Sequence, residues 1–248
     1  MTLSGKNVVV IGGSRGVGRK IVEETHREGA NVLAVARDHR ALAELAAVAT
    51  GVRTLPLDAT AEDAPDTVFG TLRPDVLVVC GGAIPPMAPL QELNWSQFSI
   101  NWEADVKASF LFCRAALRSP LSSGATVILI SSGAAMGGSP ISGGYAGAKR
   151  MQMFMANYCQ KESDRLKLGL RFCALAPARI MPETDLGRAA VDGYSRYLGI
   201  GASEFIKGMS SRQTPADVAR AVVELAANSS ARPETMFIVS GKGIEVAS

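Results

Sequence analysis

Cysteine is scarce in this sequence, and none of its four copies has the spacing of a metal or disulfide site. Cys80, Cys113, Cys159 and Cys173 form no C-x-x-C pair, and the two histidines are not closely spaced, so no zinc site, other metal site or disulfide framework is expected. No apolar run approaches the ~20 residues of a membrane span. The net charge is only +3, and lysine and arginine are scattered, which gives no basic patch for nucleic acid or membranes.

The start of the sequence lacks a cationic leader followed by an apolar segment, so a cytoplasmic protein is expected. Apolar residues make up 47% of the 248 residues and charged residues 20%, which is enough for a large core and argues against wholesale disorder. No linker or change of composition divides the chain. One domain over residues 1–248 is therefore expected.

Short runs of apolar and β-branched residues alternate with longer stretches of helical periodicity. The short runs are apolar on both faces, as parallel strands are when helices cover both sides of a sheet. Strands are expected at residues 7–11, 30–35, 75–79, 126–130, 168–175 and 236–239. Helices are expected near residues 16–28, 38–48, 61–70, 97–118, 143–165 and 215–227. This βαβ series predicts an α/β fold with a doubly wound parallel sheet of the Rossmann type.

Residues 179–213 are the least regular part of the sequence and are predicted to form a mobile loop with short helices. The large apolar side chains of this segment are Tyr194, Tyr197, Leu198, Ile200, Phe205 and Met209. A long loop after a late strand of an α/β enzyme is a candidate substrate lid. The alternative is a surface excursion with a small apolar cluster of its own.

A glycine run, Gly12-Gly13-Ser14-Arg15-Gly16-Val17-Gly18, stands where the first predicted strand turns into the first predicted helix. Glycines at this point permit a tight turn and let backbone N–H groups at the helix start approach a pyrophosphate. The spacing G-x-x-x-G-x-G differs from the G-x-G-x-x-G fingerprint, so the motif depends on its strand–turn–helix context. In that context it predicts a dinucleotide cradle.

Arg37 follows the second predicted strand, about 20 residues after the glycines, where an acidic residue would bind a ribose 2′-hydroxyl. Together with Arg15 it provides two guanidinium groups that are suited to a 2′-phosphate. NADP(H) is therefore expected in preference to NAD(H). Two alternatives stay open, because Arg37 is also compatible with a solvated surface position and the adjacent Asp38 with a ribose contact.

Tyr145 and Lys149 are four residues apart in a predicted helix, so both side chains project from one face, one turn apart. A free tyrosine has a pKa of about 10, and a neighbouring ammonium favours the phenolate. Ser132 lies at the end of the strand predicted at 126–130, where open α/β sheets bind ligands and a hydroxyl can contact a substrate oxygen. Ser131 and Ser132 should point to opposite faces, so only one of them is expected in the site.

With these motifs in place, the whole chain resembles the short-chain dehydrogenase/reductase superfamily. Residues 11–18 look like its T-G-x-x-x-G-x-G motif, Asp58 like its adenine-contacting aspartate, and Ser132, Tyr145 and Lys149 like its catalytic set. The resemblance implies that Tyr145 is the general acid/base, that Lys149 holds the nicotinamide ribose and lowers the tyrosine pKa, and that Ser132 polarises the carbonyl.

The cofactor contacts expected from the cradle and from the resemblance form one set. They are Gly12, Ser14, Arg15, Gly16, Val17, Gly18, Arg37, Asp58, Ala59, Gly81, Gly82, Tyr145, Lys149 and Ile180. Pro182 replaces a threonine that commonly contacts the carboxamide, and backbone groups around Ile180 are the expected substitute.

The sequence departs from the family pattern at two further places near the site. Residues 80–83 read Cys-Gly-Gly-Ala where the family has N-N-A-G. Asp105 stands where the family carries an active-site asparagine, whose backbone carbonyl is thought to hold a water in the proton relay to the lysine. Asp105 is counted among the catalytic candidates, but a buried carboxylate beside Lys149 would weaken the effect of the lysine on Tyr145. Asn101, one turn earlier, is a possible stand-in.

These residues predict an NADP(H)-dependent oxidoreductase that interconverts a carbonyl and an alcohol by hydride transfer. The alternative is a catalytically weak dinucleotide-binding regulatory or structural subunit of the same fold, which Asp105 and the altered residues 80–83 keep open. Residues 110–117 and 151–155 are apolar on more than one face, so burial against a second copy of the chain is expected, as a homotetramer or homodimer. The sequence does not identify the substrate.

Overall fold

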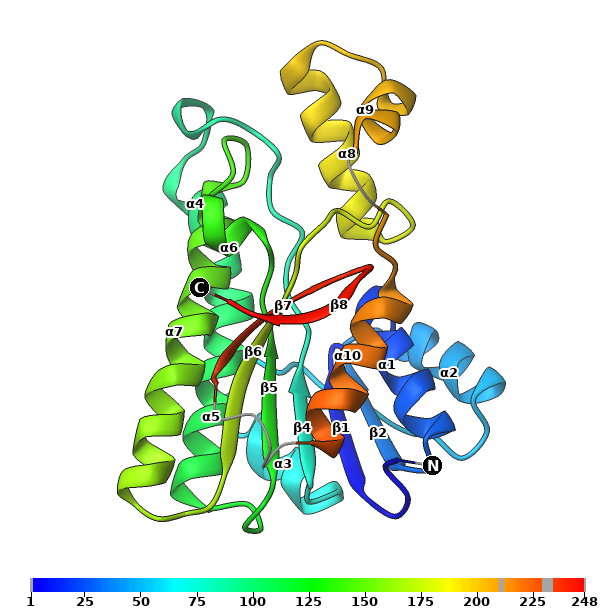
Figure 1. Ribbon diagram of the computed structural model, residues 1–248, viewed down its shortest axis with the longest axis vertical. Helices are drawn as coiled ribbons and strands as arrows, with labels where there is room; N and C mark the ends of the chain where they lie inside the picture. The colour runs from blue at the N-terminus through cyan, green and yellow to red at the C-terminus, as the bar shows by residue number, and fades with distance from the viewer. Residues whose placement is uncertain (1, 210–211, 229–233, 248) are drawn as a thin grey trace.

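One eight-stranded sheet forms the centre of the molecule (Figure 1), in the order β3-β2-β1-β4-β5-β6-β7-β8. The computed structural model describes residues 2–209, 212–228 and 234–247. All neighbouring strands are parallel except β7 and β8, which pair antiparallel at one edge. The chain leaves the centre of the sheet in both directions from β1 and β4, which is the strand order of a doubly wound fold. The predicted fold class is confirmed, with one antiparallel strand added.

The strands alternate their side chains between two separate cores. In β1, Val8 and Val10 pack in one core, whereas Val9 and Ile11 pack in the other. Both sets are fully or almost fully buried, because helices cover both faces of the sheet. The strands are β1 (Asn7–Ile11), β2 (Asn31–Ala36), β3 (Arg53–Pro56), β4 (Val76–Val79), β5 (Thr126–Ile130), β6 (Arg171–Pro177), β7 (Met236–Ser240) and β8 (Gly243–Val246).

Helices form a layer on each side of the sheet. Buried residues of α1 (Gly16–Arg27), α2 (His39–Val48) and α10 (Pro215–Ala227) belong to one core. Those of α3 (Ala64–Thr71), α5 (Lys107–Arg118) and α7 (Gly143–Arg165) belong to the other. The remaining helical elements are η1 (Leu90–Glu92), α4 (Trp95–Asn101), η2 (Trp102–Val106), α6 (Ala134–Gly137), α8 (Asp185–Leu198) and α9 (Ala202–Gly208).

The sequence prediction missed two strands and extended a third. β3 and β8 have four residues each, and every residue of both is exposed or only partly buried, so neither carries the apolar signal of the inner strands. β6 begins at Arg171 rather than at residue 168, because Gly169 adopts φ +67° in the connection that precedes it.

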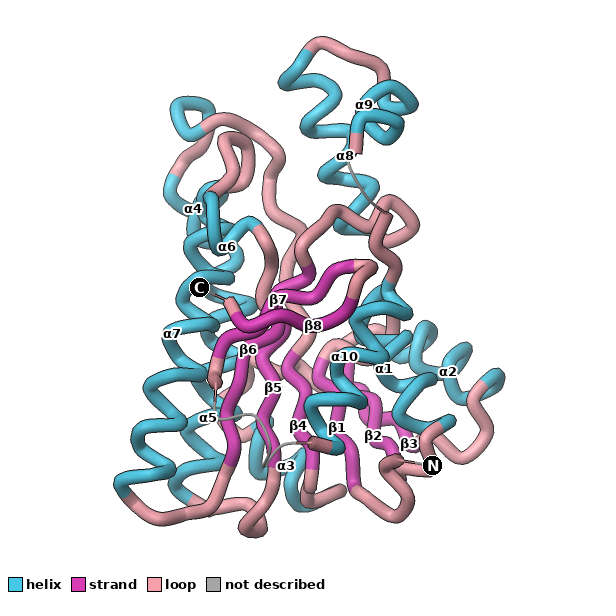
Figure 2. Tube along the Cα trace, in the orientation of Figure 1, coloured by secondary structure: helices cyan, strands magenta, loops and turns pink. Residues whose placement is uncertain are grey.

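Two segments have a different secondary structure from the one predicted. The helix predicted over 97–118 is interrupted by η2, a π-helical turn that separates α4 from α5. The segment 179–213, expected as a loop with short helices, contains the 14-residue helix α8 and the 7-residue helix α9, so more of it is helical than expected. Figure 1 and Figure 2 show these two helices above the carboxyl ends of the strands; residues 210–211 lie outside the described part of the chain. None of the described helices is long and apolar enough to cross a bilayer.

Candidate active site

The turn between β1 and α1 is built on close backbone contact. Gly12 has φ +81°, and a Cβ added there would lie 2.4 Å from the Cα of Gly81, at the end of β4. A Cβ on Gly18 would lie 2.1 Å from the carbonyl oxygen of Gly12. Real side chains do not tolerate such distances, so these glycines are required for the shape of the turn. The predicted cradle is thus a compact loop of bare backbone at the carboxyl edge of the sheet.

The start of α1 differs from that of the neighbouring helix α2. Within the described chain, no side chain caps α1, whose N-cap residue is Arg15. In α2 the carboxylate of Asp38 accepts hydrogen bonds from the amides of Arg40 and Ala41. The hydrogen bonds of these amides lower the pKa of Asp38, and the nearby Arg15 adds to this effect. Asp38 is therefore committed to capping α2, while the first amides of α1 have no side-chain acceptor and suit a phosphate.

The charged residues around the cradle are exposed. Arg37 lies at the surface after β2, and Arg15 pairs with Asp185 of α8, with 3.5 Å between Nη1 and Oδ2. Asp58 accepts two hydrogen bonds from Thr60, which lower its pKa, and the Arg37 guanidinium lowers it further. Arg37 thus lies near Asp58, whereas Arg15 pairs with Asp185 of α8. The two guanidinium groups predicted to bind a 2′-phosphate therefore have different carboxylate neighbours.

Tyr145 and Lys149 lie in the first two turns of α7 and face the end of β5. The helix reaches this position because Gly144 lets it cross α4 closely: a Cβ on Gly144 would lie 2.0 Å from the carbonyl oxygen of Phe98. The Lys149 ammonium lies 5.6 Å from the centroid of the Tyr145 ring. It donates a hydrogen bond to the carbonyl of Ile130 at 3.0 Å, which fixes the lysine against the last residue of β5.

The two serines after β5 have separate tasks. The Ser131 hydroxyl is buried and donates to the carbonyl of Lys149 at 2.7 Å, which ties β5 to α7. The Ser132 hydroxyl is only partly buried, accepts a hydrogen bond from the Ala134 amide at 3.2 Å, and forms a hydrogen bond with Tyr145. Of these two hydroxyls, that of Ser132 acts on Tyr145, whereas that of Ser131 is bonded to the backbone of α7.

Asp105 pairs directly with Lys149, with 3.0 Å between Oδ2 and Nζ, and both side chains are at least 94% buried. Its other oxygen, Oδ1, accepts hydrogen bonds from the Ala83 amide at 3.0 Å and from the Asn101 side chain at 3.1 Å. The Asn101 amide also donates to the Ala83 carbonyl at 2.7 Å. Asn101 therefore positions Asp105 and the chain after β4.

The backbone carbonyl of Asp105 is also occupied. It accepts hydrogen bonds from the Ser109 hydroxyl at 2.8 Å and from the Gln152 side chain at 3.4 Å. Gln152 additionally donates to Ser109 at 2.8 Å. Ser109 and Gln152 were not predicted from the sequence. Their helical spacing was the available signal: Gln152 follows Lys149 by three residues and Ser109 follows Asp105 by four, which places each pair on one helix face.

Burial and charge act in opposite directions on the site. Burial raises the pKa of Tyr145 and outweighs the Lys149 ammonium and the Ser132 hydrogen bond, which both lower it. Burial lowers the pKa of Lys149, but Asp105 and Tyr145 outweigh it and leave that pKa raised. Burial also raises the pKa of the Cys80 thiol, to about 11. In the protein alone, the tyrosine is therefore a neutral phenol beside a charged lysine.

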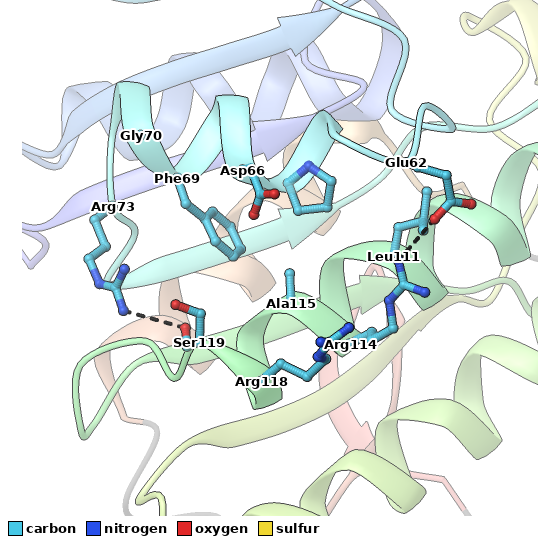
Figure 3. A pocket seen from close by; sticks show the side chains of 11 residues that line it. Glu62, Asp66, Phe69, Gly70, Arg73, Leu111, Arg114, Ala115, Arg118 and Ser119 are labelled. Carbon is cyan, nitrogen blue, oxygen red and sulfur yellow. Dashed lines mark hydrogen bonds and ion pairs between the residues drawn. The ribbon is translucent and has the colours of Figure 1, made fainter.

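Two cavities lie outside this centre. One, of about 500 Å³, lies between α3 and α5; Figure 3 shows Phe69 pointing toward Ala115, and Glu62 facing Arg114 with 3.0 Å between Oε2 and Nη2. It shares no lining residue with the cradle or with the Tyr145 centre. The other, of about 490 Å³, is lined by Ile180 and Pro182 after β6, by Ile206 of α9 and by residues between α9 and α10. This second cavity is the one beside the predicted cofactor residue Ile180.

Comparison with known proteins gives consistent results. Residues 6–193 match the model of the short chain dehydrogenase family. L-xylulose reductase of Bos taurus is 26% identical over 52% of this chain and 53% of its own length, so the chain matches about half of that relative. A 2,5-dichloro-2,5-cyclohexadiene-1,4-diol dehydrogenase of Sphingobium indicum is 29% identical over 79% of this chain and 81% of its own length.

The fold has a close counterpart among solved structures. The crystal structure of a short-chain dehydrogenase/reductase, described as a glucose/ribitol dehydrogenase, from Brucella melitensis superposes with a TM-score of 0.78. The superposition covers 96% of this chain and 95% of the other at 19% identity. At that identity the likeness shows the fold alone.

Proposed function

Because the chain belongs to the short chain dehydrogenase family, we propose that it interconverts a carbonyl and an alcohol with a nicotinamide cofactor. One observation carries the proposal. Ser132, Tyr145 and Lys149 meet at the carboxyl edge of the sheet, and the bare-backbone turn at Gly12 lies at the same edge. A proton donor and a dinucleotide cradle on one edge are what hydride transfer to a carbonyl needs.

The residues divide the work of carbonyl reduction. Ser132 accepts a hydrogen bond from the Ala134 amide on its oxygen, so its hydrogen can turn from the Tyr145 oxygen to the substrate carbonyl oxygen. Tyr145, a neutral phenol in this environment, gives its proton to that oxygen as the carbon accepts a hydride. Lys149 is fixed by Ile130 and Asp105 and presents positive charge beneath the tyrosine ring.

The cradle fits a dinucleotide. A Cβ at Gly12 or Gly18 would fill the turn, and the amides at the start of α1 have no side-chain cap in the described chain. Residues Ser14, Gly16 and Val17 belong to this turn, Asp58 and Ala59 follow β3, and Gly81 and Gly82 follow β4, which places them at one edge. When bound, the nicotinamide supplies or accepts the hydride.

NADP(H) is the preferred cofactor in this proposal. Asp38 is committed to the N-terminus of α2, which removes the acidic residue that would otherwise compete for a ribose hydroxyl. Arg37 is exposed at the end of β2 and available to a 2′-phosphate. Arg15 reaches the same phosphate only if it leaves Asp185.

The segment 179–213 serves as a substrate lid in this proposal, with α8 and α9 as its body. Tyr194 and Phe205 stack with 5.6 Å between ring centroids, so the two helices move as a pair. The Tyr194 hydroxyl is 2.8 Å from the Ser139 hydroxyl, which links α8 to the loop after α6. A small number of polar links of this kind allows opening and closing.

A homodimer or homotetramer is the proposed assembly, and one domain is the proposed unit. Phe110 on α5 is 47% exposed, while Phe154 and Tyr158 on α7 are 40% and 52% exposed. Phe154 and Tyr158 stack with 6.3 Å between centroids, which forms an apolar surface that a second copy would cover. Light scattering checks this: a monomer mass at micromolar concentration would contradict it.

The test of the function is a fluorescence titration with NADPH and NADH, followed by turnover of the tighter cofactor with ketones, aldehydes and quinones. We expect turnover, and a loss of about 10²–10⁴-fold in kcat for Tyr145→Phe with cofactor affinity unchanged. Tyr158→Phe, on the outer face of α7, is the matched control. Tight cofactor binding with no turnover on the whole panel would favour a catalytically weak dinucleotide-binding subunit, for which the Lys149–Asp105 pair is the supporting observation.

A further inference from the structure

Asp105 is held in a site that is built for it. Its carboxylate contacts three donors: the Lys149 ammonium, the Ala83 amide and the Asn101 side chain. A Cβ on Gly82 would lie 2.4 Å from Oδ2 and 2.6 Å from Oδ1, so the carboxylate fills the space that any side chain at position 82 would take. The two sequence departures, at residues 80–83 and at 105, are therefore spatially one feature.

The same feature removes the acceptor on which a relay water would depend. The Asp105 carbonyl has two lone pairs, and both face side-chain donors, from Ser109 and Gln152. The Lys149 ammonium has three donors, and two of them are used by Asp105 and by the Ile130 carbonyl. Lys149 thus has a buried acidic counterion in direct contact.

Lys149 and Asp105 both act on the pKa of Tyr145, so their effects must be taken together. The titratable groups that act on it are Lys149 on its own helix, Asp105 on η2 and Cys80 after β4, together with the Ser132 hydroxyl after β5. Lys149 favours the phenolate, whereas Asp105 and Cys80 oppose it. Opposite charges in direct contact largely cancel at a third group, so the positive field that would ionise the tyrosine is weakened.

We propose that Asp105 is a positioning residue that neutralises Lys149 and, together with the burial of Tyr145, keeps Tyr145 a proton donor through the neutral range, which leaves carbonyl reduction at its full rate and alcohol oxidation below its plateau there. The proposal rests on the proposed function. In the reduction, the carbonyl carbon accepts the hydride of the reduced nicotinamide, the C=O π pair moves to oxygen, and that oxygen takes the Tyr145 proton. The carbonyl becomes an alcohol, and the nicotinamide is oxidised.

The protein leaves the reaction equilibrium unchanged, because a catalyst accelerates both directions equally; the one proton that reduction consumes makes that equilibrium shift about tenfold per pH unit. Asp105 instead sets the pH at which kcat/KM for reduction begins to fall and kcat/KM for oxidation stops rising. While Tyr145 is protonated, kcat/KM for carbonyl reduction is constant with pH, and kcat/KM for alcohol oxidation rises about tenfold per pH unit. Oxidation reaches its plateau only above the pKa of Tyr145.

The experiment is a near-ultraviolet titration of tyrosinate in the wild type, with the Tyr145→Phe trace subtracted so that only Tyr145 is read. We expect Tyr145 of the wild type to ionise at or above the ordinary tyrosine value of about 10. In Asp105→Asn the ionisation should move down by at least about one pH unit, and the rising limb of kcat/KM for oxidation should move with it, which raises the rate about tenfold or more at a fixed pH below the plateau. Asp66→Asn, which removes an exposed carboxylate on α3, should leave both unchanged.

Each result has a definite meaning. A Tyr145 titration that is not shifted in Asp105→Asn would overturn the proposal. A wild-type midpoint below about pH 9 would also overturn it, and that measurement does not require an Asp105 variant that folds. A shifted titration in a protein that binds NADPH but turns over no carbonyl compound would instead refute the proposed function and leave the charge arrangement standing. The spectroscopic and kinetic readouts therefore separate the two.

Discussion

The dinucleotide cradle and the proton-transfer centre lie at the same edge of the sheet but are held by opposite means. In the cradle, backbone packing fixes the shape, through Gly12 and Gly18, and the charges around it are exposed: the Arg15 and Asp185 side chains are 65% and 43% exposed. In the centre, the charges fix the shape: Lys149 and Asp105 are 6% and 1% exposed and receive further hydrogen bonds.

The difference follows from what each region handles. A cofactor that must enter and leave needs a preformed backbone surface and charges that water can accompany, and an exposed ion pair contributes only about 0–1 kcal/mol. A proton donor needs its electrostatic surroundings fixed before the substrate arrives. Burying a pair of charges achieves this, although each of them would be strongly destabilising without the other.

The largest expected effect is on the buried pair. Asp105→Ala leaves the Lys149 ammonium buried without its counterion, so we expect the free energy of unfolding to fall by about 3–5 kcal/mol in urea titrations. The double variant Asp105→Leu with Lys149→Met removes both charges and should recover most of that loss. A loss below about 1 kcal/mol in the single variant would mean that the pair does not hold the centre.

The backbone of the cradle comes next. Gly12→Ala must relieve a contact of 2.4 Å and a φ of +81°, and we expect a loss of about 2–4 kcal/mol together with weaker cofactor binding. Gly5→Ala is the matched control, because Gly5 has φ +75° and no atom within 4 Å of its added Cβ. It should cost only about 1–2 kcal/mol, and equal losses in the two variants would show that packing contributes nothing at Gly12.

The exposed arginine of the cradle should affect binding and not folding. Arg37→Gln should weaken NADPH binding about 10–100-fold, the worth of a charge-assisted contact, and leave NADH binding within about twofold. Fluorescence titration of both cofactors measures this. Arg40→Gln, three residues later on α2, is the control; an equal change for NADPH and NADH in Arg37→Gln would remove the basis for cofactor preference.

The smallest effect is expected at the exposed pair. Asp185→Asn should change the free energy of unfolding by less than about 1 kcal/mol, with the difference shrinking as salt is added. Because it frees Arg15 from α8, the same substitution should leave NADPH affinity equal or tighter. Weaker NADPH binding in Asp185→Asn at low salt would show that Arg15 depends on Asp185 for its position.

Much of the architecture was predictable from the sequence because its signals are local. β1, with four β-branched residues in five, has the predicted boundaries, and so do β5 and α7, while most other elements differ by only a few residues. The strands that escaped prediction, β3 and β8, are the two short edge strands, whose residues are not buried on both faces. The family, too, was recognisable, since glycine and Y-x-x-x-K spacings are properties of the chain itself.

The break between α4 and α5 was not predictable in the same way. Nothing in the local sequence from Trp95 to Arg118 forces a π-helical turn, and the predicted single helix was the natural reading. The turn carries Asp105, whose partners Ala83 and Lys149 come from distant parts of the chain. π-helical turns of this kind often mark functional sites, where tertiary contacts outweigh local preference.

The sequence by itself determined the order of the elements, the glycine turn and the identities of Ser132, Tyr145 and Lys149, because those depend on residue type and on spacing along one chain. Only the tertiary structure decided that Arg15 turns to Asp185 and that Asp105 closes on Lys149 over Gly82. Those outcomes depend on which charges and hydrogen-bond donors meet in space, and burial then sets how strongly each one acts on its neighbours.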